Sequence, residues 1–122
     1  MAQLLFLDTF ESDSGNLTVI EKIMPGSIKR VFYIYETEEM LQIGRRYHQA
    51  WHAILCLNGS CRIQAMSGSQ STRFVLDDPQ KCLLLEPEDW HQIEELTSGA
   101  FLLVISNEYD DPADYGPANF NP

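Results

Sequence analysis

Short apolar segments separated by turn residues run along the chain, and this pattern predicts β-strands rather than helices. The clearest segment runs from Ile28 to Tyr35, where β-branched and aromatic residues follow one another. Turn residues recur at about every 8–12 positions, as in β-sandwiches and barrels. We therefore expect an antiparallel all-β fold, with strands at residues 4–10, 17–20, 28–35, 53–57, 60–65, 73–76, 82–85 and 100–106.

The length of 122 residues predicts one domain, residues 1–122, with one core. Turns are expected around residues 13–16, 24–26, 67–71, 77–79 and 87–90. From Asp110 to Pro122 the sequence is rich in Pro and Asp, which predicts an irregular tail that packs on the domain.

An Asn58-Gly59 pair stands between two apolar runs, which is the strongest short-range signal for a β-hairpin. The predicted arms are Ala53–Leu57 and Ser60–Ala65. Such a hairpin would bring Cys56 and Cys61 near each other.

The segment from Gly44 to His52 precedes this hairpin and holds an unusual density of polar chemistry. It contains two of the three histidines and two of the five arginines, together with a tyrosine and a tryptophan. Imidazoles transfer protons near neutral pH, and guanidinium groups bind anions. We expect these groups to lie on a strand that enters the hairpin.

A helix over residues 36–53 is the alternative, because Met40, Ile43, Tyr47, Trp51 and Ile54 recur at helical spacing. It would place His48 and His52 on one face, at the spacing of a zinc-binding pair. On a strand the two residues are about 13 Å apart and cannot share one ion. Gly44 and the start of the hairpin favour the strand, so we expect no metal site and a structural role for His52.

The formal net charge of −10 comes from 8 basic and 18 acidic residues. This excess disfavours generic binding to nucleic acid or to acidic membranes, but it leaves room for a small anionic ligand bound by a few arginines. The three cysteines are an odd number, the first residues lack an export signal, and no apolar run reaches the about 20 residues of a membrane span. These features predict a cytoplasmic protein with reduced thiols.

Several blocks resemble, in order, the sugar-nucleotide 3,4-ketoisomerases, which are cupin-fold enzymes that act on dTDP-4-keto-6-deoxyglucose. The matching blocks cover nearly the whole chain: residues 15–21, 28–35, 56–62, 83–87, 90–91, 98–104, 108–111 and 114–115. The resemblance implies a cupin-type jelly roll, a homodimer that often exchanges N-terminal strands, and no cofactor. It also implies a tautomerisation through an enediol, which needs an acid–base group and donors for the developing oxyanion.

The family motif Arg-Gly-x-His-Ala-His carries the acid–base histidines, and this chain departs from it. A gap-free alignment back from Cys56 places Arg45 and Tyr47 at the two histidine positions. An alignment forward from Ile28 places His48 on the second histidine if one residue is deleted. The expected base is therefore His48, with Tyr47 as the alternate if a nearby arginine lowers its phenol pKa from about 10.

Four further residues are expected to bind the substrate, and three of them, Arg30, Tyr33 and His91, by resemblance to family positions. Arg30 and Arg46 are expected to contact phosphate or oxyanion, with Arg45 in the same role, and Tyr33 and His91 to line the sugar.

The preferred function is a ketoisomerase of a dTDP-linked 4-keto-6-deoxyhexose, which supplies a deoxy-sugar precursor for surface polysaccharide. Two rivals stay open at this point. One is a non-catalytic cupin that binds a sugar nucleotide, and the other is a sugar-nucleotide 3,5-epimerase on the same fold.

Overall fold

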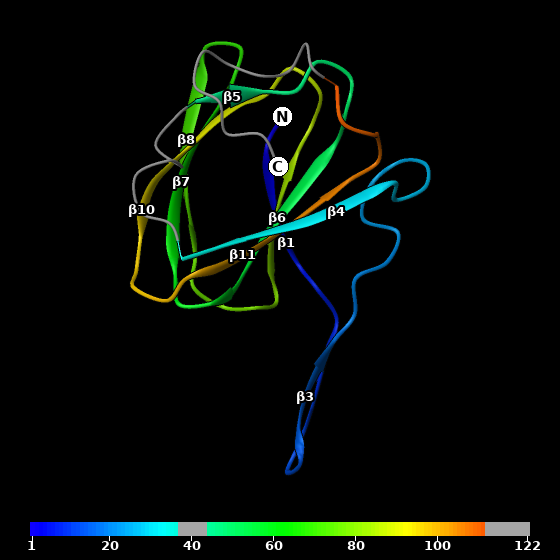
Figure 1. Ribbon diagram of the computed structural model, residues 1–122, viewed down its shortest axis with the longest axis vertical. Coiled ribbons are helices and arrows are strands. Elements are labelled where there is room, and N and C mark those ends of the chain that lie inside the picture. The colour runs from blue at the N-terminus through cyan, green and yellow to red at the C-terminus, as the bar shows by residue number, and fades with distance from the viewer. Residues whose placement is uncertain (37–43, 112–122) are drawn as a thin grey trace.

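A computed structural model of the chain describes residues 1–36 and 44–111 (Figure 1), and every regular element in these two ranges is a β-strand. The strands are β1 (Gln3–Phe6), β2 (Thr9–Ser12), β3 (Gly15–Thr18), β4 (Arg30–Tyr35), β5 (Arg45–Arg46), β6 (His52–Asn58), β7 (Cys61–Ser67), β8 (Gln70–Leu76), β9 (Lys81–Leu85), β10 (Trp90–Leu96) and β11 (Phe101–Ser106).

Two antiparallel sheets face each other across the main core. The larger sheet has the order β1-β9-β6-β11-β4, and the smaller has the order β5-β10-β7-β8. Apolar side chains from both sheets fill the space between them, among them Ile54 and Leu102 from the larger sheet and Ile63 and Ile93 from the smaller. The predicted all-β antiparallel jelly roll is confirmed. The predicted irregular tail lies outside the described residues from position 112 onward.

The predicted hairpin around Asn58-Gly59 is wrong, because β6 and β7 belong to different sheets. Both edges of β6 are already hydrogen-bonded, to β9 on one side and β11 on the other. The turn bonds instead to the neighbouring turn, where the Asn58 side chain donates to the Gly99 carbonyl at 2.9 Å. Gly59 is needed here, since its φ is +71° and a Cβ would lie 2.6 Å from Thr97 Oγ1.

Strand β6 is buried on both faces, which explains why its sequence is apolar without alternation. Ile54 and Cys56 face the smaller sheet, whereas Ala53 and Leu55 face a second apolar cluster on the outer side. Leu7, Met24 and the partly buried Trp51 belong to that outer cluster. The strand therefore sits at the centre of the molecule, and its first residue is His52.

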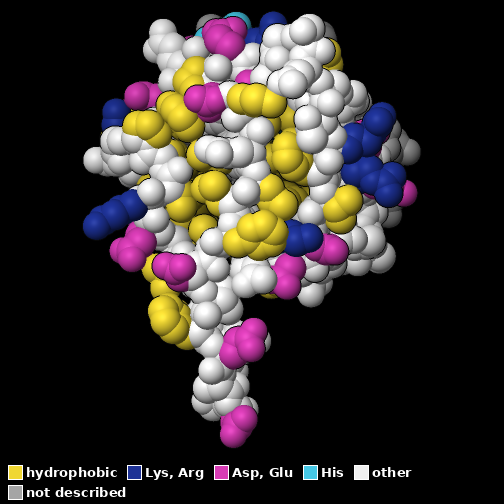
Figure 2. All heavy atoms as spheres, turned by 180° about the vertical axis from the view of Figure 1, so that it is seen from behind, with side chains coloured by type: hydrophobic (Ala, Val, Ile, Leu, Met, Phe, Trp, Pro, Cys, Tyr) yellow, Lys and Arg dark blue, Asp and Glu magenta, His cyan; other side chains and the backbone are white. Residues whose placement is uncertain are grey.

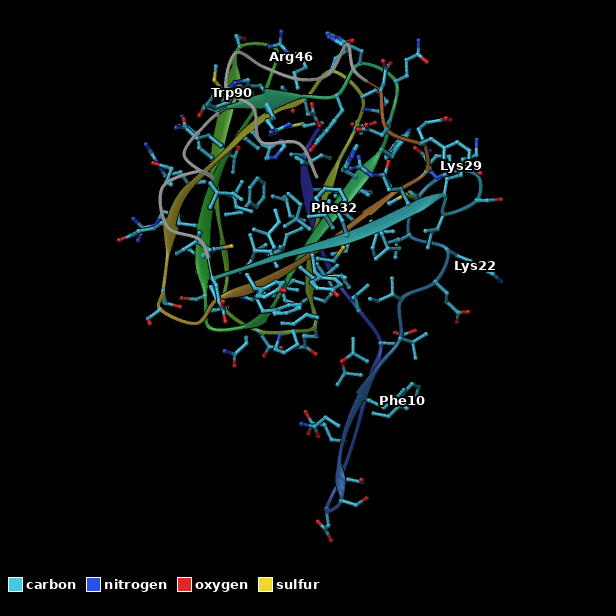
Figure 3. The ribbon with its side chains drawn as sticks, in the orientation of Figure 1. Phe10, Lys22, Lys29, Phe32, Arg46 and Trp90 are labelled. Atoms are coloured by element: carbon cyan, nitrogen blue, oxygen red, sulfur yellow. The ribbon has the colours of Figure 1, made fainter. Side chains whose placement is uncertain are left out.

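Strands β2 and β3 form a hairpin that projects away from the two sheets (Figures 1 and 3). Phe10 and Leu17 pair across it, and their side chains are 63% and 60% exposed. On the face seen in Figure 2, hydrophobic side chains gather above the base of this arm, between charged ones. A projecting arm with exposed apolar side chains is unusual on the surface of a soluble monomer.

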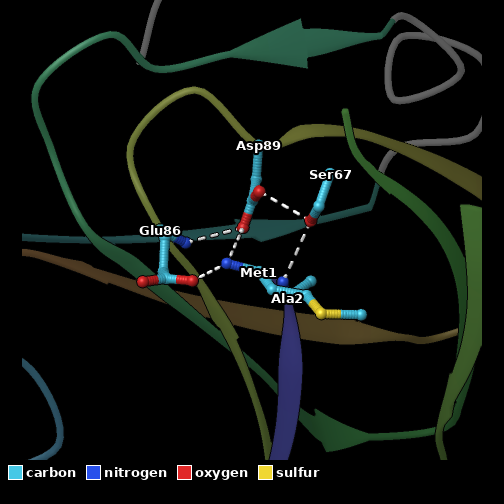
Figure 4. A network of polar contacts seen from close by, with 5 residues as sticks. All are labelled: Met1, Ala2, Ser67, Glu86 and Asp89. Carbon is cyan, nitrogen blue, oxygen red and sulfur yellow. Dashed lines mark hydrogen bonds and ion pairs between the residues drawn. The ribbon is translucent and has the colours of Figure 1, made fainter. Parts of the chain in front are cut away.

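The amino-terminal residues are tied to the turn before β10 (Figure 4). The amino group of Met1 contacts Glu86 and lies 3.7 Å from Oδ2 of Asp89. Asp89 accepts hydrogen bonds from the Glu86 backbone at 2.9 Å and from Ser67 Oγ at 2.7 Å. This network fixes the start of β10, the strand that carries His91.

Within the described residues, no helix is long and apolar enough to cross a membrane.

Candidate active site

One row of the site comes from the inner face of the larger sheet. His52 of β6 pairs with Ser106 of β11, and Ser106 pairs with Arg30 of β4. Directly paired residues on antiparallel strands project from the same face, so the three side chains lie in one row across the sheet. They share that face with Ile54 and Phe32, which contact the main core.

The opposing row comes from the smaller sheet, where Arg45 of β5 pairs with His91 of β10. His91 also pairs with Ala65, a residue of the main core, so its imidazole points between the sheets. Gly44, just before β5, allows the chain to pass close to β10. A Cβ at this position would lie 2.3 Å from the Trp90 indole.

Tyr47 joins the two rows. Its ring stacks on the His52 imidazole with a centroid distance of 3.5 Å and lies 5.7 Å from that of His91. The Tyr47 carbonyl accepts a hydrogen bond from the Glu88 backbone at 2.7 Å, which ties the segment after β5 to the turn before β10. Three groups capable of proton transfer or hydrogen bonding to a hydroxyl therefore meet at one end of the sandwich.

Both imidazoles are neutral at physiological pH. The pKa of His52 is lowered from 6.5 to about 3, mainly by burial and in part by the charges of His91 and Arg30, against a hydrogen bond to the Ala50 backbone that raises it. The pKa of His91 is likewise lowered to about 4, mainly by burial and in part by the charge of Arg45, while the charge of Asp89 acts to raise it. Removal from water penalises the charged imidazolium, which explains why the pKa is lowered at both histidines.

The Nδ1 atoms of His52 and His91 have no hydrogen-bond partner in the described part of the chain, although both side chains are buried. Buried polar atoms are nearly always paired, and the exceptions cluster where a ligand or a catalytic role supplies the partner. The two unpaired nitrogens mark this end of the sandwich as the place where a polar ligand is expected.

Two guanidinium groups flank the imidazoles. Arg30 lies over the Phe32 ring at 4.6 Å and forms an ion pair with Asp110, with 3.2 Å between Nη1 and Oδ1. Arg45 is close enough to His91 for its charge to lower the imidazole pKa. Positive charge beside neutral imidazoles suits a substrate that carries phosphate, or one that develops an oxyanion.

The structure brings together four of the residues expected from the sequence, namely Arg30, Arg45, Tyr47 and His91. It places His48 elsewhere. The His48 side chain is half exposed, and its Nδ1 lies 3.0 Å from Oε1 of Glu88 at the surface. His48 follows Tyr47 directly, and the chain turns there so that only Tyr47 faces the imidazoles.

Arg46 and Tyr33 also lie away from this cluster, and strand alternation gives the reason. Arg46 is exposed and pairs with Trp90, on the face of β5 opposite to Arg45 (Figure 3). On β4, Arg30 and Phe32 face inward, so Tyr33 faces outward. It is 58% exposed and stacks on Phe101 at 5.3 Å.

His52 is the residue that sequence reasoning assigned only a structural role. The sequence of β6 does not alternate and gave no signal for this residue; in the structure His52 shares its face with Ile54 and Cys56. The helix considered over residues 36–53 is not formed in its described part, where β5 and the start of β6 lie. No group of three or more His, Cys, Asp or Glu side chains in residues 1–36 and 44–111 is arranged to hold a metal ion.

Comparisons with known proteins agree with one another. The model of the family FdtA, described as WxcM-like, C-terminal, matches residues 1–119. A curated relative, the TDP-4-oxo-6-deoxy-alpha-D-glucose-3,4-oxoisomerase of Aneurinibacillus thermoaerophilus, is 36% identical over 104 residues, which are 83% of this chain and 75% of the relative.

Solved structures with the same fold include two 3,4-ketoisomerases. The TDP-quinovose 3,4-ketoisomerase WlaRB of Campylobacter jejuni superposes with a TM-score of 0.86 at 26% identity, covering 93% of this chain and 90% of that one. The 3,4-ketoisomerase QdtA of Thermoanaerobacterium thermosaccharolyticum, solved in complex with TDP, gives 0.83 at 31% identity, covering 97% and 88%.

Proposed function

Because this chain belongs to the FdtA family, we propose that it is a 3,4-ketoisomerase of a dTDP-linked 4-keto-6-deoxyhexose. The observation that carries this function is the family match over residues 1–119, combined with the contact of the partly buried Tyr47 with the buried imidazoles of His52 and His91. The relatives named above are isomerases, which favours an enzyme over a binding module and a ketoisomerase over a 3,5-epimerase.

The reaction moves a carbonyl from C4 to C3 of the sugar. A base removes the C3 proton, an enediol forms, and a proton is added at C4. We assign the base to Tyr47 rather than His48, because Tyr47 lies against both buried imidazoles and His48 is engaged with Glu88 at the surface. Arg45 would stabilise the oxyanion, and His91 would contact the sugar.

Arg30 is the proposed contact for the diphosphate. Its guanidinium lies at the end of the inner row that starts at His52. Its partner Asp110 is 42% exposed, so an incoming phosphate can compete for the guanidinium. Tyr33 and Arg46 are left out of the proposed site, because both project away from the space between the sheets.

Millimolar dTDP should raise the melting temperature of the protein, and the rise should be larger at low salt than at high salt. The reason is that a ligand bound only by the folded state stabilises it, while salt screens the contact between phosphate and arginine. Differential scanning fluorimetry at two salt concentrations measures both effects. Thymidine without phosphate is the control and should give a smaller shift. A flat response to dTDP would contradict the nucleotide assignment.

We also propose that two copies pair and exchange their N-terminal strands, as the family resemblance implies. The projecting hairpin β2–β3 supports this, since the exposed side chains of Phe10 and Leu17 need an apolar surface to cover them. Each copy offers such a surface on β4, where Val31, Tyr33 and Tyr35 are all more than half exposed.

Replacing Phe10 and Leu17 with glutamate should convert the dimer to a monomer, because two charges per arm would be buried in the interface. Size-exclusion chromatography with light scattering measures the mass. Val75→Glu is the matched control, since Val75 is an exposed apolar residue on β8 in the other sheet. A double glutamate variant that stays dimeric would refute the exchange, as would a monomeric wild type.

The proposed setting is the cytoplasm, where the product would serve as a deoxy-sugar precursor for surface polysaccharide. The three cysteines of the chain are free and buried, which suits a reducing compartment.

A further inference from the structure

Cys56 and Cys61 meet in the main core although they belong to different sheets. Cys56 lies near the end of β6 in the larger sheet, and Cys61 begins β7 in the smaller one. Both side chains are buried in the apolar cluster between the sheets. The Cys56 thiol donates a hydrogen bond to the Asn58 carbonyl at 3.2 Å, and a second hydrogen bond joins the two thiols, so Cys61 is its donor. The turn between the strands therefore places two sulfur atoms side by side.

The shared hydrogen bond makes the two thiols chemically different. The pKa of the Cys56 thiol is lowered, mainly by this bond and in part by backbone hydrogen bonds at Phe101 and Asn58, against burial, which raises it. The pKa of Cys61 is raised, mainly by the same bond and in part by burial and by the charge of Cys56. Because the thiolate is the nucleophile, Cys56 is the sulfur that attacks an oxidant, and Cys61 is the sulfur that attacks the oxidised product.

A surface pocket gives a small oxidant a route to this pair. The pocket has a volume of about 180 Å³, and Cys61 lines it together with Ser60, Leu96 and Thr97. A water molecule takes up about 30 Å³ in the liquid, so a pocket of this size admits hydrogen peroxide. The third cysteine, Cys82, is buried in the outer apolar cluster, and burial raises the pKa of its thiol to about 12. Oxidation should therefore select the pair over Cys82.

We propose that Cys56 and Cys61 form a reversible disulfide when the protein meets hydrogen peroxide. The Cys56 thiolate attacks one peroxide oxygen and becomes a sulfenic acid, while the O–O bond breaks and the other oxygen leaves as water with the proton that Cys56 lost. The Cys61 sulfur then attacks the Cys56 sulfur, the S–O bond breaks, and the hydroxyl group leaves as water with the Cys61 proton. Two thiols are oxidised to one disulfide and one peroxide is reduced to two waters. A dithiol reductant reverses the bond by thiol–disulfide exchange.

The disulfide joins the two sheets at a distance from the candidate active site. Cys56 is four residues beyond His52 on β6, which is about 13 Å along the strand. The proposal therefore does not depend on the proposed ketoisomerase reaction. Its chemical consequence is protection, because a sulfenic acid that meets a second thiol forms a disulfide, whereas one that does not is oxidised further to sulfinic and sulfonic acids that thiols do not reduce.

The test is a peptide map of the wild-type protein, in which Cys82 is the internal control. Trypsin releases Cys56 and Cys61 together in peptide 47–62, whereas Cys82 begins a different peptide. The folded protein is treated with hydrogen peroxide, free thiols are alkylated, and the peptide masses are measured. We expect peptide 47–62 to lose the mass of two hydrogen atoms at least about 10-fold faster than Cys82 is oxidised, and dithiothreitol to restore both thiols. In urea the three thiols should be oxidised at similar rates, since only folding makes them different.

Cys61→Ser separates the two steps. Cys56 should still become a sulfenic acid, which dimedone traps, and should then be oxidised irreversibly, because the second sulfur is gone. Cys82→Ser is the matched control and should form the disulfide at the wild-type rate. Oxidation of Cys82 before the pair in the folded wild type would overturn the proposal, as would sulfinic acid at Cys56 in place of the disulfide. If Cys61→Ser does not fold, the wild-type peptide map decides alone.

Discussion

Lowering the pH from 7.5 to 4.5 should reduce the free energy of unfolding by about 5 kcal/mol through His52 and His91 alone. Their pKa values are depressed in the folded protein, from 6.5 to about 3 and about 4. The unfolded chain therefore takes up protons first as the pH falls below about 6.5. The contribution of the two neutral imidazoles to the free energy of unfolding is fully present above that pH. It declines as the pH falls, until the folded-state pKa values are reached.

Urea unfolding followed by circular dichroism between pH 4.5 and 7.5 measures this decline. The double variant His52→Gln with His91→Gln should show a shallower dependence, because two groups that bind protons only on unfolding are gone. His48→Gln is the matched control, since its side chain is at the surface beside Glu88. Equal slopes for the wild type and the double variant would show that the two imidazoles are not held neutral by burial.

Replacing Tyr47 with phenylalanine should lower kcat by about 100- to 10,000-fold, the usual range for loss of a group that transfers protons. Phenylalanine keeps the ring that stacks on His52 and removes only the hydroxyl group, so the fold and dTDP affinity should persist. Product formation from dTDP-4-keto-6-deoxyglucose, followed by chromatography, gives the rate. Activity of the wild type should rise toward alkaline pH, because a phenol ordinarily loses its proton near pH 10.

The comparison variant is His48→Asn, which should keep activity within about two-fold, because a change at an exposed side chain seldom disturbs a buried site. The opposite result, with His48→Asn inactive and Tyr47→Phe active, would favour the gapped alignment of the family motif. It would require the segment after β5 to rearrange when substrate binds, so that His48 leaves Glu88 and turns inward.

Much of the fold follows from the sequence because alternation and turn residues act locally. The strand predicted at residues 28–35 is present as Arg30–Tyr35, with the same end and a start two residues later. The hairpin at Asn58-Gly59 was not, because the turn signal says that the chain reverses but not which strand it then pairs with. Strand β10 was missed because its sequence is mostly polar. Only His91 and Ile93 are buried in it, and a residue such as the exposed Glu95 is more typical of a loop.

The site was only partly predictable, for a related reason. Arg45 and Tyr47 were found through the gap-free alignment, and the structure puts both beside the imidazoles. Tyr33 was misplaced because a match to a family block does not fix which face of a strand a side chain occupies, and a shift by one residue exchanges the two faces. His52 was missed because its chemistry depends on burial and on the sheet opposite, which no local pattern contains.

Strands β5 and β6 differ in the number of strands to which they are hydrogen-bonded, and their local stabilities should differ accordingly. Strand β6 is paired on both edges and buried on both faces, so its amides should exchange with solvent only on global unfolding. Strand β5 has two residues and, within residues 1–36 and 44–111, pairs with β10 alone. We therefore expect the amides of β5, including that of Arg45, to exchange with solvent at a lower free energy than those of β6. Hydrogen exchange should therefore divide the site into a slow half, which carries His52, and a faster half, which carries Arg45.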